Sequence, residues 1–303
     1  MLLAGLLKPS YIPAKEQREL RDLTRFRTKM IQDVASEKNR IVRILEDCNI
    51  KLSSVLSNTQ GVVATKLIDK LCEEGTITMS DIEEVYHKRL EASKEDLYEA
   101  CQGLIDKHHI YLLGLIRQDI ASTEAVIKNL NGRIKEVLSG YDNVLENLKA
   151  IPGLSTKTVE DLVAEIGLDM SVFPTEKHLA SWAGMCPGNN ESAGKKKSGR
   201  TTHGNKQVKA VITEAAWAAT RTKNTFYSAR YHRVAARRGK KRALIAVGHS
   251  ILKSVYHVIN GMEGYKELGA DYVTQRVEKR RKLYLKKELE KLGYAVQLIQ
   301  PVP

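Results

Sequence analysis

The chain has 303 residues, a net charge of +13 and an aromatic content of only 6%. This length suits about two domains, and the abundance of Leu, Ala, Lys, Glu and Arg predicts a mainly α fold. No apolar run reaches the roughly 18 residues that a bilayer-spanning helix needs, and the four cysteines form no C-x-x-C pair. These features argue against a membrane-spanning protein, a zinc knuckle and a disulfide framework, and they favour a location in the cytoplasm.

The first predicted element is a long helix over residues 14–56, preceded by Pro13, which a helix start tolerates. Arg27 and Glu37 interrupt its apolar face. A cleaner pattern follows over residues 113–137, where positions three and four apart form a coiled-coil seam. We expect two long helices, packed antiparallel within one chain or pairing between chains. The apolar positions are Leu20, Leu23, Met30, Val34, Ile41 and Ile44 in the first helix, and the seam of the second is Leu113, Ile116, Ile120, Thr123, Ile127, Leu130, Ile134 and Val137.

Residues 57–100 are expected to form a helical cap between the two long helices, broken into two short helices at Gly75 and Thr76–Ser80. Beyond the arm, Gly140 and the turn Ile151-Pro152-Gly153 mark a boundary. The fold class predicted is therefore mainly α, with a long coiled-coil arm followed by a compact helical domain.

The boundary turn is followed by another helical pattern. Ser155 or Thr156 would cap that helix, and Lys157 beside its free N–H groups can hold a phosphate. The pattern looks like a helix-hairpin-helix, which grips nucleic-acid backbone without reading bases; an ordinary interhelical turn is the alternative. Asp161 and Glu165 share a face of this helix four residues apart, and we interpret them as a solvated face rather than as metal ligands. We predict no metal site in this chain.

Residues 181–206 read SWAGMCPGNNESAGKKKSGRTTHGNK, an apolar turn followed by a polar loop that carries Ser192. The hydroxyl could attack a phosphodiester while the cations behind it hold the backbone. We expect Ser192 to be exposed on the face bearing Arg200 and Lys206. An ordinary loop serine is the alternative, because the sequence offers no His-Asp pair to activate it. His203 is interpreted as a loop residue or phosphate contact, and His249 as a core histidine.

Two further helices are predicted at residues 206–222 and 243–260, with the basic segment 230–242 between them. Tyr227 and Tyr231 could stack on a base; a solvated basic linker with two packed tyrosines is equally compatible. Their expected inward positions are Val208, Ile212, Ala215 and Ala219 in the first helix, and Leu244, Val247, Ile251, Val255 and Val258 in the second. Residues 272–299 are predicted to form a basic helix and then a short strand, Tyr294–Ile299.

The charge is divided unevenly along the chain. Residues 1–150 hold 22 basic and 23 acidic residues, whereas residues 151–303 hold 27 and 13. Between Lys195 and Arg242 there are 15 basic residues and one acidic residue. Such a field attracts polyanions, nucleic acid above all, although a merely solubilising surface is the alternative. The predicted nucleic-acid-binding residues are Lys157, Lys195, Lys196, Lys197, Arg200, Lys206, Lys209, Arg233, Arg237, Arg238, Lys240, Lys241 and Arg242.

Several segments together resemble a known family. They are Ile151-Pro152-Gly153, the run 179–187 (LASWAGMCP), Glu191-Ser192, the turn Ser198-Gly199-Arg200 with Gly204-Asn205, and upstream the stretches 19–23, 37–40 and 50–54. This combination is similar to the C-terminal domain and central coiled coil of insertion-sequence one-ten family transposases.

The resemblance implies a mechanism. In that family a RuvC-like domain supplies four acidic residues that bind Mg²⁺, a serine in the C-terminal domain forms a covalent link to DNA, and a structured non-coding RNA guides the choice of sites. By this resemblance the catalytic residue is Ser192. The acidic residues have no counterpart here, so we expect a truncated or split transposase, inactive alone, whose Mg²⁺ would come through the missing domain.

The expected domains are residues 1–13 as a remnant after the missing domain, 14–145 as the coiled-coil region with its cap, 146–262 as the transposase domain and 263–303 as a basic tail. The expected partners are DNA, a structured RNA and further copies of the chain in a dimer or tetramer, with no membrane. The alternatives are a non-catalytic nucleic-acid-binding remnant and a helix-hairpin-helix scaffold protein.

Overall fold

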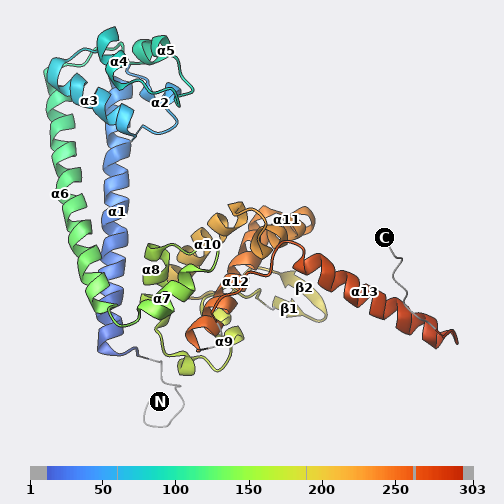
Figure 1. The fold of residues 1–303 in the computed structure, drawn as a ribbon. Helices are drawn as coiled ribbons and strands as arrows, with labels where there is room; N and C mark the ends of the chain where they lie inside the picture. The colour runs from blue at the N-terminus through green and yellow to red at the C-terminus, as the bar shows by residue number, and fades with distance from the viewer. Residues whose placement is uncertain (1–11, 60, 189, 262–263, 296–303) are drawn as a thin grey trace. The chain divides into compact units, whose positions relative to one another are not determined.

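The computed structural model describes residues 12–59, 61–188, 190–261 and 264–295 (Figure 1). Within these ranges the chain forms thirteen α-helices, one 3-10 helix and one two-stranded hairpin, so the predicted mainly α fold is confirmed. The chain divides into two compact units, Asp22–Val137 and Met1–Arg21 with Leu138–Pro303. None of the described helices is long and apolar enough to cross a bilayer.

The first unit is built on an antiparallel pair formed by α1 (Lys15–Asp47) and α6 (Lys107–Val137) (Figure 1). Every predicted seam position of α6 is buried or half-buried, which confirms the seam read from the sequence. Lys38 Nζ lies 3.1 Å from Glu124 Oε1, and Arg27 Nη1 donates to Asn131 Oδ1 at 3.0 Å. Arg27 is 2% exposed, so its stem packs in the seam while its guanidinium reaches a polar partner.

Helix α1 ends at Asp47, and the prediction that it continues to residue 56 is wrong. Asn49 adopts a left-handed conformation with φ of 60°, and the N–H of Ile50 bonds back to the carbonyl of Leu45 at 2.8 Å. This is the Schellman arrangement that terminates helices, and Asn tolerates the left-handed position. Ile50 is thereby turned into the core, where it is 1% exposed. A separate short helix, α2 (Leu52–Val55), follows.

Residues 57–100 hold three helices instead of the two predicted. After α2 come α3 (Val62–Glu74), α4 (Met79–Val85) and α5 (Lys94–Ala100). The predicted break at Gly75 is confirmed, since this glycine ends α3 in the left-handed region. The further divisions come from capping boxes at Thr78 and Ser93, whose side chains bond three residues ahead. The core of the cap includes Leu67, Leu71, Ile82, Leu97 and Leu113.

The second unit is organised around α12 (Lys240–Ile259), which packs against α7 (Asp142–Lys149), α9 (Glu176–Trp182), α10 (Lys206–Arg221) and α11 (Phe226–Arg238) (Figure 1). Helix α8 (Thr156–Ile166) packs on α7 and α10, and a 3-10 turn, Met170–Val172, precedes α9. The predicted inward residues of α10 and α12 are buried, apart from Leu244, which is half-buried. The helical periodicity of the sequence therefore predicted the inward positions of these two helices correctly.

The basic segment 230–242 is not a linker. It is the second half of α11 and the first turn of α12, joined at Gly239. Tyr227 and Tyr231 face the core and are 1% and 8% exposed, so the hypothesis that they stack on a base is wrong. The last element is α13 (Tyr272–Lys291), the predicted basic helix. Of the predicted strand Tyr294–Ile299, all but the first two residues lie outside the described part of the chain.

Candidate nucleic-acid interface

Ser192 lies near the tip of a β-hairpin, where the sequence suggested an irregular loop. β1 (Asn190–Ser192) pairs antiparallel with β2 (Lys195–Ser198), and Ser192 stands opposite Lys195. The two residues between them, Ala193 and Gly194, have φ of 51° and 74°, which is the backbone of a tight two-residue hairpin turn. Ser192 and Lys195 are both exposed, as the nucleophile hypothesis requires.

The two legs of the hairpin stay hydrogen-bonded beyond the strands, on the side away from the turn. The N–H of Gly188 donates to the carbonyl of Arg200 at 2.7 Å, and that of Thr202 donates to Cys186 at 3.2 Å. At the base, the two legs approach so closely that a Cβ on Gly204 would lie 2.2 Å from the backbone nitrogen of Gly184. Only glycine fits at such a contact, which explains the glycine turn that follows the polar segment.

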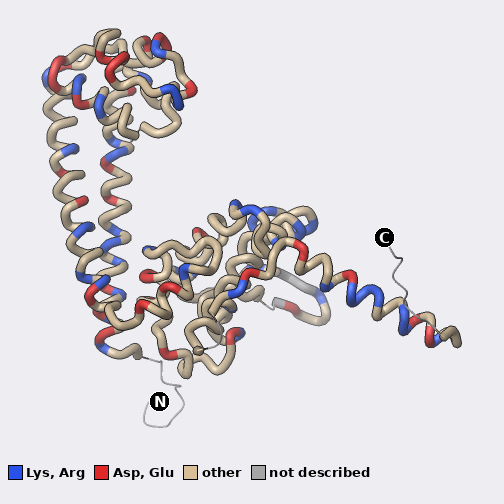
Figure 2. The backbone as a smooth tube through the Cα atoms, viewed as in Figure 1, with Lys and Arg blue, Asp and Glu red and all other residues tan. Residues whose placement is uncertain are grey.

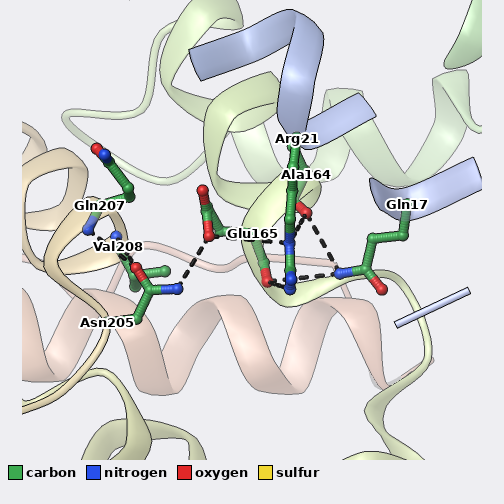
Figure 3. Close-up of polar contacts among 7 residues, drawn as sticks. All are labelled: Gln17, Arg21, Ala164, Glu165, Asn205, Gln207 and Val208. Carbon is green, nitrogen blue, oxygen red and sulfur yellow. Dashed lines mark hydrogen bonds and ion pairs between the residues drawn. The ribbon is translucent and has the colours of Figure 1, made fainter. Parts of the chain in front are cut away.

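Asn205 anchors this base to the helical core. Its side-chain oxygen accepts from the N–H groups of Gln207 at 2.9 Å and Val208 at 3.1 Å, and so caps α10 (Figure 3). Its amide nitrogen donates to Glu165 Oε2 at 2.9 Å (Figure 3). Its own N–H bonds to the carbonyl of Trp182 at 3.1 Å. One residue therefore links the end of the hairpin, the start of α10 and the end of α8.

Glu165 is also held from α1 (Figure 3). Arg21 Nε donates to the carbonyl of Ala164 at 2.9 Å and lies 3.8 Å from Glu165 Oε2, and its Nη2 donates to the carbonyl of Glu165. Gln17 Nε2 adds a bond to Ala164 at 3.3 Å. These side chains satisfy carbonyls that the last turn of α8 leaves without helical partners.

The interpretation of Asp161 and Glu165 as a solvated helix face is wrong. They are 5% and 3% exposed. Asp161 is paired with Lys157, whose Nζ lies 2.7 Å from its Oδ2. The pair holds Lys157 over its own helix, so this cation is partly neutralised before any phosphate arrives.

The glycine turn before α8 packs on α10. Ser155 caps α8 as predicted, by accepting from the N–H of Thr158. Gly153 has φ of +90°, and a Cβ there would lie 2.2 Å from the carbonyl oxygen of Ala215. This side of the turn is covered by protein. That the motif grips nucleic-acid backbone stays a prediction.

A cavity of about 1,120 Å³ opens beside the hairpin legs, between the segment Gly199–Thr201 and helices α11 and α12. Figure 2 shows Lys and Arg gathered where α11 ends and α12 begins. Five cationic side chains line the cavity, and none of its lining residues is a carboxylate. Such a site favours an anion with several charges, such as a nucleic-acid backbone. The cations are Arg200, Arg230, Arg238, Lys241 and Arg242, and the apolar lining includes Met185, Pro187, Val234 and Ile245.

Two residues that line the cavity, Arg230 and His249, have a lowered pKa. Burial, and then the charge of Arg233, lower the pKa of Arg230, and its buried Nε has no hydrogen-bond partner among the described residues. Burial is also the main cause that lowers the pKa of His249, with Lys253 and Arg230 adding to it. His249 is half-buried and lines the cavity, so the interpretation of it as a core histidine is wrong.

The structure places the predicted nucleic-acid-binding residues in several locations. Four of them, Arg200, Arg238, Lys241 and Arg242, meet at the cavity. Arg233, Arg237 and Lys240 are exposed on α11 and α12, and the side chains of Lys196 and Lys197 lie outside the described part of the structure. Lys206 and Lys209 line a separate groove.

Sequence reasoning missed Arg230 as a cavity residue. The available signal was its spacing, because Arg230, Val234 and Arg238 recur every four residues and so share one face of α11. The interpretation of this segment as a linker did not use that spacing, because the four-residue repeat has meaning only in a helix. In the part of the chain that the structure describes, no three or more His, Cys, Asp or Glu side chains are grouped so as to hold a metal ion. These residues therefore do not fit a Mg²⁺ site.

Comparison with known proteins gives one assignment. Residues 145–232 match the family model described as the transposase IS116/IS110/IS902 family. The matched span begins within α7, continues through α8, α9, the Ser192 hairpin and α10, and ends within α11. A comparison with curated proteins gave no match. This match shows that the chain carries, at residues 145–232, a transposase domain of the IS116/IS110/IS902 family, which implies DNA binding and transposition.

Proposed function

We propose that this chain binds nucleic-acid backbone in the basic cavity and that Ser192 attacks a DNA phosphodiester during transposition. The observation that carries the proposal is the placement of the serine and a cation on one hairpin. Ser192 is exposed beside the turn, and Arg200, on the returning leg, lines the cavity with four further cations. Cations so placed would neutralise the charge that develops on the phosphate during attack.

In the proposed step, Ser192 Oγ forms a bond to phosphorus while the bond from phosphorus to one deoxyribose oxygen breaks. The serine hydroxyl loses its proton, and the departing oxygen gains one. The product is a covalent phosphoserine link to one DNA end, with a free hydroxyl on the other end. Reversal of this step with a different strand would exchange the strands.

Two parts of the proposal rest on the resemblance found in the sequence. A structured RNA would guide the choice of DNA sites. Mg²⁺ would be supplied by acidic residues of a RuvC-like domain, because the described part of this chain offers no group of ligands for it. A metal ion there would stabilise charge on the phosphate and the leaving oxygen.

We also propose that the chain assembles with further copies of itself, through the α1–α6 arm. Several large apolar side chains remain exposed on the two helices, including Phe26, Tyr111 and Leu115, which are 48%, 65% and 46% exposed. Exposed apolar area of this kind is typical of an interaction surface. Light scattering of the purified chain should give the mass of a dimer or tetramer, and Tyr111→Lys with Leu115→Lys should lower it to that of one chain.

Covalent capture tests the serine step. The full chain would be mixed with element-end DNA, Mg²⁺ and the RNA co-expressed with it, and separated on a denaturing gel. We expect an adduct that Ser192→Ala abolishes and that Ser171→Ala, an exposed serine outside the hairpin, retains. An adduct formed equally by Ser192→Ala would assign the attack to another residue.

Binding must be measured beside capture. If no variant forms an adduct and salt-sensitive DNA binding persists, the chain is a nucleic-acid-binding protein without cleavage activity of its own. Loss of both in Ser192→Ala would indicate a folding defect, which circular dichroism would detect. Ser192→Cys, which keeps a nucleophile of similar size, should retain part of the adduct.

A further inference from the structure

Trp217 is an exposed aromatic side chain on α10, which packs against α12. Tyr227 and Tyr231 are buried, whereas Trp217 on α10 is 45% exposed. The indole is not part of the core face of α10, whose buried residues are Val208, Ile212, Ala215, Ala216, Ala219 and Thr220. The indole is therefore accessible to a ligand at the surface of α10.

Trp217 lines a shallow groove of about 610 Å³ between one face of α10 and the start of α12. Lys206, Lys209 and Thr213 line it from the preceding turns of α10, at spacings of three and four residues, and Leu244 lines it from α12. The groove thus has two cations at one end and an aromatic ring at the other. Glu214 is the one carboxylate among its lining residues.

The indole ring is held in place by its neighbour one turn on. The guanidinium carbon of Arg221 lies 4.8 Å from the centre of the ring, a cation–π contact. This contact limits the ring's freedom before any ligand binds, which lowers the entropy lost on stacking. Arg221 also adds a third cation beside the groove.

The groove is connected to the hairpin. Lys209 Nζ donates to Thr201 Oγ1 at 2.7 Å, and Thr201 lines the basic cavity. Lys209 therefore lies at the border between the cavity and the groove, close to the phosphates of a strand bound in the cavity. This continuity, together with the cations, identifies a nucleic-acid strand as the ligand that best fits the groove.

We propose that the groove binds an unpaired nucleotide of a DNA strand, with its base stacked on Trp217 and its phosphates near Lys206 and Lys209. Every base has a π-face, so this contact would hold a strand regardless of its sequence. The inference rests on the proposed nucleic-acid binding but adds a separate site, which recognises unpaired over paired DNA.

The chain contains only two tryptophans, Trp182 and Trp217, which allows a direct test. Trp182 packs on Phe173 with ring centres 5.4 Å apart, so Trp182→Phe should keep that contact and leave Trp217 as the single fluorophore. The fluorescence of this full-length variant would be titrated with an oligothymidine. We expect quenching that saturates together with binding measured by anisotropy.

Two controls separate the base from the backbone. An abasic oligonucleotide of the same length carries the phosphates alone and should bind without quenching Trp217. In the converse variant, Trp217→Phe, the remaining Trp182 should not respond to either oligonucleotide. Trp217→Ala should weaken oligothymidine binding by roughly five- to hundredfold, the usual effect of one stacked base, and should leave abasic binding unchanged.

The outcomes distinguish this inference from the proposed function. Salt-sensitive binding of both oligonucleotides without quenching of Trp217 would overturn the stacking site and leave backbone binding intact. Absence of binding to either would remove the proposed function and this inference together. A shift of the Trp217 emission with protein concentration alone would mean that a second copy covers the groove, and would overturn the inference too.

Discussion

The side-chain amide of Asn205 donates a 2.9 Å hydrogen bond to the carboxylate of Glu165, a residue that is 3% exposed (Figure 3). The two residues are 40 positions apart, and the whole Ser192 hairpin lies between them in the chain. The bond therefore closes the hairpin segment onto α8 while Asn205 also caps α10. We infer that Glu165 fixes the base from which the hairpin projects.

Replacing Glu165 should destabilise the transposase domain. Glu165→Ala would remove the acceptor of Asn205 and the carboxylate beside Arg21, and leave both donors partly buried. Breaking a buried charged contact of this kind costs roughly 2–4 kcal/mol. Urea unfolding followed by circular dichroism would measure the loss.

The matched control for this change lies on the same helix as Arg21. Glu19 Oε1 lies 3.6 Å from Lys15 Nζ, and the two side chains are 60% and 76% exposed. An exposed pair is worth little, so Glu19→Ala should change the unfolding free energy by less than about 0.5 kcal/mol. Equal effects of the two variants would contradict the role given to Glu165.

Glu165 also illustrates the limit of local sequence patterns. Its spacing from Asp161 is the spacing of an ordinary solvated helix face. Its burial depends on Arg21 and Asn205, which reach it from distant parts of the chain. The seam of α6 was predictable because its repeat is local, whereas a buried polar network is defined by tertiary contacts that no local window contains.

The same distinction applies to the aromatic and basic residues. Tyr231 and Trp217 both lie on helices rich in cations, yet the tyrosine is buried and the tryptophan is exposed. Which ring faces the core depends on where α12 packs. Arg230 likewise lines the cavity because α11 is helical through Arg238. The helix places the side chains of Arg230 and Arg238 on one face.

Gly153 should not tolerate alanine. A Cβ there would lie 2.2 Å from the carbonyl oxygen of Ala215, and the φ of +90° is itself unfavourable for an L-residue. Gly140 is the matched control, because its φ is +95° and nothing lies within 4 Å of the position of its Cβ. Thermal and urea unfolding should place Gly153→Ala about 1–3 kcal/mol below Gly140→Ala, the cost of forcing α10 away from the turn. Equal losses would mean that the turn and α10 are not in contact.

The cavity cations should set the salt dependence of DNA binding. Each phosphate contact contributes a slope of about 0.9 to the fall of log affinity with log salt concentration on duplex DNA. Arg238→Gln and Lys241→Gln should each lower the slope by about one, and the double variant by about two, because both side chains line the cavity. Lys128→Gln, an exposed cation of α6 in the other unit, should leave the slope unchanged. Unchanged slopes in the cavity variants would exclude this cavity as the backbone-binding site.

His249 should make the stability of the domain depend on pH below neutrality. Burial, then the charges of Lys253 and Arg230, lower its pKa in the folded protein, against a smaller opposite effect from Glu176. A histidine that is harder to protonate when folded binds more protons in the unfolded chain, so the unfolding free energy should fall as the pH drops below about 6.5. His249→Gln keeps a polar side chain but cannot titrate, and should flatten this part of the profile between about pH 7.5 and 5.5.

Polyanions should oppose the effect of pH on stability, because phosphates bound in the cavity would favour the protonated imidazole of His249. Urea unfolding across this range, with and without an oligonucleotide, would measure both effects, and a wild-type profile identical to that of His249→Gln would contradict the assignment.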